Sequence, residues 1–140
     1  MVLFETKGRI LYPKDALAFN PPPVAPQAVA ITGTLEADTA LNATLGFYAR
    51  LLVPASDPNC SDLSIYNIPV YTCTPGDSDE KVGEASFSGT QSTSLSLGGK
   101  NLTQGVAQGK FWLGLEVQGL PAGMVTLKLK EPKALVTVGL

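Results

Sequence analysis

Residues 44–53 read Thr-Leu-Gly-Phe-Tyr-Ala-Arg-Leu-Leu-Val, and this stretch decides the fold class. Apolar side chains stand at every second position from Leu45 through Phe47 to Val53, and most of the positions between them are polar or small. A period of two residues places these apolar side chains on one face of an extended strand. The stretch therefore predicts a β-strand that turns one face toward the interior.

Two later stretches, 111–117 and 125–129, show the same period of two. Residues 119–123 between them contain two glycines and a proline, a composition typical of turns. We therefore expect these two strands to form a hairpin. The side chains expected in the core from all three strands are Leu45, Phe47, Leu51, Phe111, Leu113, Leu115, Val125 and Leu127.

The rest of the chain contains further short candidate strands separated by glycine and proline, with one short helical segment at 102–108. This spacing predicts an all-β, antiparallel sandwich of two sheets, and the immunoglobulin-like and jelly-roll topologies both remain open. A strand at 63–71 would lie at an edge because it contains Pro69. The remaining strands are expected at 2–12, 28–35, 81–87, 92–97 and 134–140.

The N-terminal region predicts the domain organisation. Residues 1–12 form a strand arm, 13–26 a proline-rich linker, and 27–140 the sandwich domain. Five of the fourteen linker residues are proline, and such a segment is a stiff spacer that covers about 3 Å per residue. Either the arm folds back onto its own sandwich, or it completes the sheet of a neighbouring copy by strand addition. The arm residues expected to make this contact are Val2, Phe4, Ile10 and Tyr12.

The two cysteines predict a disulfide. Cys60 and Cys73 both lie in turn-rich sequence, so a bond between them would join the two ends of one excursion of the chain. The alternative is a pair of reduced thiols in a cytosolic protein.

Asn42, Asn59 and Asn101 each begin the Asn-X-Ser/Thr pattern of a glycosylation acceptor. Asparagine, serine and threonine also gather in loops because they form turns, so coincidence is the competing explanation. Use of these sites would fit an exported protein.

The composition excludes most kinds of catalytic site. The chain has no histidine, so it cannot build a Ser-His-Asp site, a Cys-His site or an imidazole-based metal site. The acidic residues around the cysteines lack the spacing of a calcium loop, and we expect them to be solvated. We therefore expect no enzyme activity, no metal and no cofactor. These acidic residues are Asp57, Asp62, Asp77, Asp79 and Glu80.

Tyr48 and Trp112 fall on the face opposite the predicted core side chains. Exposed aromatic rings on a sandwich can stack against sugars, so the two residues are candidates for a ligand platform. Packing beneath another segment is the competing explanation.

The formal net charge of −2, without a run of lysine or arginine, argues against a nucleic-acid partner. No stretch of 18 or more apolar residues predicts membrane insertion. The low charged fraction of 16%, the expected disulfide and the glycosylation patterns favour an extracellular, cell-surface or virion protein.

The sequence as a whole predicts a non-enzymatic structural subunit of a surface assembly, such as a filament, coat or decoration layer. Its partners would be copies of itself or other subunits, joined through the N-terminal strand. The rival hypothesis is a monomeric secreted binding module, with carbohydrate as the ligand.

Overall fold

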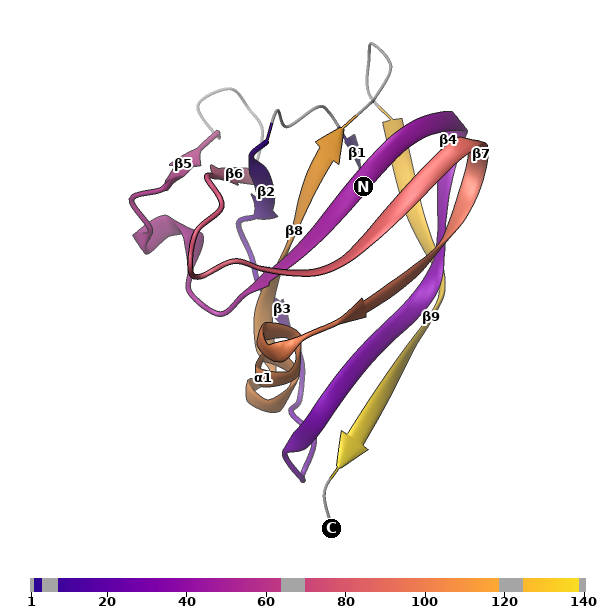
Figure 1. The fold of residues 1–140 in the computed structure, drawn as a ribbon. Coiled ribbons are helices and arrows are strands. Elements are labelled where there is room, and N and C mark those ends of the chain that lie inside the picture. The colour runs from indigo at the N-terminus through magenta and orange to yellow at the C-terminus, as the bar shows by residue number, and fades with distance from the viewer. Residues whose placement is uncertain (1, 4–7, 64–69, 119–124, 139–140) are drawn as a thin grey trace.

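The structure is a computed structural model that describes residues 2–3, 8–63, 70–118 and 125–138 (Figure 1). The described residues are mostly β-strand, and every strand pairing among them is antiparallel. The elements in chain order are β1 (Val2–Leu3), β2 (Ile10–Pro13), β3 (Leu17–Ala18), β4 (Pro26–Arg50), the short 3₁₀ helix η1 (Pro54–Ser56), β5 (Cys60–Asp62), β6 (Val70–Cys73), β7 (Glu80–Gly98), α1 (Lys100–Gln108), β8 (Lys110–Gln118) and β9 (Val125–Val138).

The 25-residue strand β4 organises the sheet. It pairs with β7 along most of its length, with β9 along its first half and with β8 along its second half. The pairing with β7 shifts register between Glu36 and Asn42, where β-bulges interrupt the ladder. Bulges let a long strand bend, and Figure 1 shows β4 and β7 side by side and folded over in the upper right of the view.

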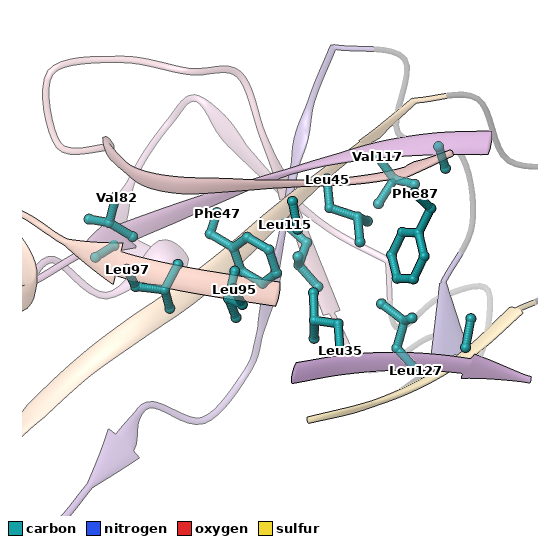
Figure 2. Close-up of a cluster of buried hydrophobic side chains, with 14 of the residues drawn as sticks. Leu35, Leu45, Phe47, Val82, Phe87, Leu95, Leu97, Leu115, Val117 and Leu127 are labelled. Carbon is teal, nitrogen blue, oxygen red and sulfur yellow. The ribbon is translucent and has the colours of Figure 1, made fainter. Parts of the chain in front are cut away.

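The main hydrophobic core lies between the two halves of this bent sheet. Figure 2 shows Phe47, Leu45 and Leu115 from one half facing Leu35 and Leu127 from the other. Of the eight side chains expected in the core, five are less than 9% exposed, and Leu51 and Leu113 pack against the cluster while partly buried. The eighth, Val125, has a side chain outside the described residues. The predicted inward face is therefore confirmed.

The antiparallel β class is confirmed, but the division into two separate sheets is not. The strands follow one continuous order, β1-β9-β4-β8-β2-β6-β5, with β7 joined to β4. Strands expected as separate units form the single long strands β4, β7 and β9. The predicted hairpin of β8 and β9 is wrong, because β4 lies between them and takes one edge of each.

The N-terminal segment differs most from expectation. A single strand over residues 2–12 is wrong, because Gly8 is in a turn with φ +82° and β2 begins only at Ile10. β2 lies between β6 and β8 of its own chain, and β1 pairs with β9. Ile10 and Tyr12 are fully buried, so they do not form a free arm for a second copy. Phe4 lies outside the described residues, as does the side chain of Val2.

The proline-rich linker is attached to the domain and is not a free spacer. Within it, β3 pairs with β8 through Leu17 and Phe111. The backbone N–H of Phe19 donates a hydrogen bond of 2.9 Å to the carbonyl of Gly109. The Phe19 ring packs edge-on against Phe111, with 6.2 Å between ring centroids. The linker therefore crosses the surface of its own domain.

The predicted helical segment is present as α1, and Gly105 lets it approach β8 closely. A Cβ atom on Gly105 would lie 2.6 Å from Cβ of Phe111, closer than packed carbon atoms come. The sequence indicates the helix but carries no signal for its contact with Phe111.

The contact predicts the sign of one substitution. Gly105→Ala within a helix normally gains about 1 kcal/mol, but here the added methyl group collides with Phe111, so we expect a loss of about 1–3 kcal/mol in the free energy of unfolding. Urea denaturation measures this, with Gln104→Ala, at an exposed position of the same helix, as the control. A more stable Gly105→Ala variant would contradict the packing.

Candidate functional site

The most unusual polar group in the structure is Arg50, which is fully buried at the end of β4. Its guanidinium lies 2.6 Å from the carboxylate of Asp57 and 3.4 Å from that of Asp79. Its Nε donates a hydrogen bond of 2.9 Å to the carbonyl of Leu52. The ring of Tyr12 stacks against the guanidinium, 5.3 Å from Cζ to the ring centroid.

The predicted disulfide is present and lies against this arginine. Cys60 and Cys73 are directly opposite each other on β5 and β6 and are bonded. Nη1 of Arg50 lies 3.2 Å from Sγ of Cys60 and 3.6 Å from Sγ of Cys73. Arg50 at the end of β4 thus contacts Asp57, Asp79 and the disulfide. These contacts fix the segment that follows β4 against β4 itself.

The expectation that the acidic residues are solvated is wrong for the two that contact Arg50. The side chain of Asp79 is 2% exposed and that of Asp57 is 11% exposed. The hydrogen bond from Arg50, assisted by the backbone N–H of Asn59, lowers the pKa of Asp57 below its ordinary value. In the described part of the chain, no group of three or more Cys, Asp or Glu side chains could hold a metal ion.

The polar groups of the Arg50 cluster are paired with one another. Every buried side-chain nitrogen and oxygen among the described residues has a hydrogen-bond partner, so none of these groups is left aimed at a ligand. Tyr12 donates a hydrogen bond of 2.6 Å to Asp79, and burial together with this bond raises the pKa of Tyr12. A tyrosine held neutral in this way is a poor nucleophile and a poor base.

The ligand platform expected from Tyr48 and Trp112 is wrong for Trp112. Both residues lie opposite the main core, as the sequence indicated, but β2 and β6 cover that face. Trp112 is only 4% exposed and packs with Ile10 and Tyr12. Tyr48 is half-buried, and its hydroxyl donates a hydrogen bond of 3.0 Å to Glu116.

The three asparagines of the glycosylation patterns lie in different environments. Asn42 and Asn59 are exposed, so both could accept a glycan sterically. Nδ2 of Asn101 donates hydrogen bonds to the carbonyls of Ala49, at 2.9 Å, and Ser78, at 3.3 Å. A glycan on that nitrogen would break both bonds, so the structure argues against Asn101 as an acceptor.

The surface feature that sequence reasoning missed is the outer edge of β9. One edge of β9 pairs with β4, and among the described residues β1 pairs with the other edge at Val125 and Thr126. Along 128–138, no strand in the described part of the chain pairs with that second edge. All residues from 128 to 138 are exposed, and four of them are large and apolar: Leu129, Leu135, Val136 and Val138.

An apolar cleft of about 570 Å³ lies beside this edge. Buried core side chains such as Phe47 and Leu102 line the cleft, together with Leu17 of β3, Leu113 of β8 and Leu129 of β9. Among the described residues that line it, Lys128 and Lys130 are the only charged ones. The cleft therefore lies against the main core, at a place where the described residues of β8 and β9 do not pair with each other.

Comparisons with models of protein families, with curated proteins and with solved structures find no match to this chain. None of the helices in the described ranges has the length and apolar character needed to cross a membrane.

The buried ion pairs predict a large effect at Arg50. Arg50→Met would leave Asp79 buried without its cation, so we expect a loss of about 3–5 kcal/mol in the free energy of unfolding. Lys81→Met is the control, because the Lys81–Glu84 pair is exposed and contributes about 1 kcal/mol or less. Equal losses for the two variants in urea denaturation would contradict the role given to Arg50.

The raised pKa of Tyr12 predicts that the free energy of unfolding depends on pH in alkaline solution. The folded-state pKa of Tyr12 is raised above its ordinary value of 10.0, so its stabilising contribution is complete below pH 10 and is lost as pH rises beyond that. The difference in unfolding free energy between the native chain and Tyr12→Phe should therefore shrink between about pH 8 and pH 11. A difference that stays constant over this range would show that Tyr12 does not titrate differently on unfolding.

Proposed function

We propose that the protein is a non-enzymatic structural subunit of an extracellular or virion surface assembly, such as a filament, coat or decoration layer. The observation that carries this proposal is the open edge of β9, where the described residues leave backbone groups unpaired beside exposed apolar side chains. Such an edge is a template for pairing with another chain. A protein that circulates as a monomer would be expected to cover it.

The strand contact differs from the one that the sequence indicated. The described N-terminal residues pair within their own chain, so the contact proposed here uses the edge of β9 and not β2. The proposed mode of contact is still strand addition, but the strand that makes it is β9 near the C-terminus instead of the N-terminal arm.

The location of the assembly outside the cell is supported by two features. A disulfide persists in an oxidising compartment, and the structure contains the bond between Cys60 and Cys73. The exposed asparagines Asn42 and Asn59 are compatible with the surface of an exported protein. The rival hypothesis, a monomeric carbohydrate-binding module, loses its principal support because the ring of Trp112 is buried.

The proposal predicts self-association of the full chain. Light scattering after size-exclusion chromatography should give a mass above that of one 14.6 kDa chain, and Val136→Lys should lower it by placing a charge on the apolar edge. Val53→Lys is a matched control, because Val53 is 39% exposed against 44% for Val136 but lies away from β9. A monomer at millimolar concentration would refute the proposed function.

A further inference from the structure

The open edge of β9 and the apolar cleft form one continuous surface. Leu129 and Lys130 belong to the open edge and also line the cleft. Leu17 and Leu129, which both line the cleft, are 48% and 45% exposed. A partner that covers one of these features therefore also meets the other.

The surface favours a strand over a small apolar ligand. A lipid chain could contact the leucines of the cleft, but it has no groups to pair with the N–H and C=O groups along β9. An added strand satisfies those groups and also supplies alternating side chains, half of which point into the cleft. The backbone groups and the apolar cleft together therefore fit an added β-strand.

The faces of β9 identify a suitable strand within the chain itself. In the β4–β9 ladder, Thr32 lies opposite Lys133 and Thr34 opposite Lys130, so Glu131 and Pro132 form a bulge opposite one residue of β4. Residues paired across strands share a face. Leu129 shares the inner face with buried Leu35, as does Val136 with buried Val29.

The end of β9 is apolar enough to fill such a site. Residues 134–138 read Ala-Leu-Val-Thr-Val, without charge or proline. Lys128, Lys130, Pro132 and Lys133 occupy the preceding stretch, and charges and proline are the usual protection of an edge strand. In the described part of β9 after Lys128, residues 134–138 are therefore the segment without charges or proline to prevent edge pairing. This is the segment that would pair with a partner.

We propose that two copies of the chain pair along the open edges of β9, so that residues 134–138 of each copy cover the cleft of the other. The strands run antiparallel about a two-fold axis, with Leu129 opposite Val136 of the partner subunit. In this register inner faces meet inner faces, with the bulge at Glu131 and Pro132 counted as one position. Lys130 lies opposite Leu135 of the partner subunit, and the Lys133 residues of the two copies lie opposite each other at the axis. The contact is closed, so larger assemblies grow through another face.

This inference rests on the proposed function and names the contact by which copies associate. The test is the double variant Leu129→Cys with Val136→Cys, oxidised as the full chain at the concentration where association is observed. The two positions lie seven residues apart on one strand, about 23 Å, so they cannot bond within one chain. Peptide mapping by mass spectrometry should find a covalent dimer in which position 129 of one copy is linked to position 136 of the other, with the native Cys60–Cys73 bond intact.

The control is Leu129→Cys with Val53→Cys, which should give no linkage between the two introduced thiols. Links of 129 to 129 or of 136 to 136 would overturn the register. An assembly seen by light scattering without any cross-link would overturn this contact and leave the proposed function standing, whereas a monomer would overturn both. A fatty acid found on a monomer by native mass spectrometry would also overturn it and make the cleft a ligand site.

Discussion

The pairing of β4 with three other strands is the constraint on which the rest of the structure depends. Because β4 is long and bends at its bulges, one strand supplies both walls of the main core. β8 and β9 each use one half of β4, so they do not pair with each other. The apolar cleft beside the core and the open edge of β9 both follow from this arrangement. The proposed contact between copies therefore follows from how β4 is paired.

Arg50 fixes the segment that covers the face of β4 and β8 opposite the main core. The chain leaves β4 at this residue, and the ion pairs to Asp57 and Asp79 bring the excursion back over Trp112 and Tyr12. Burying a charge has a large desolvation cost, which paired and hydrogen-bonded partners offset. The cluster thus makes a second, smaller core possible on the outer face of β4 and β8. It also explains why that face does not present the ring of Trp112 to a ligand.

The sequence predicted the local features well. Alternation identified the strands and the inward face of Phe47 and Leu115, and the turn residues around Cys60 and Cys73 indicated the disulfide. The sequence could not reveal which strands pair. Alternation with a period of two residues shows which side chains share one face of a strand, but it does not identify the neighbouring strand. For the N-terminal segment the sequence left folding back and strand addition both open, because its contacts with β8 depend on tertiary packing.

The candidate site was harder to predict than the fold. Arg50 stands in the polar half of an alternating strand, where an arginine is normally exposed, and nothing nearby in sequence indicates that Asp79 will meet it. The edge of β9 was missed because an unpaired edge is a property of the whole topology. Its residues, taken alone, describe an ordinary strand.

Hydrogen exchange along β9 can show whether its open edge is covered by a second copy of the chain. In a strand, alternate N–H groups point to opposite edges, so about half of the amides in 133–138 face the open side. If two copies pair along β9, these amides should exchange slowly in the native chain at high concentration and rapidly after dilution or in Val136→Lys. Rapid exchange that does not change with concentration would contradict this pairing, because the edge would then be permanently exposed to water.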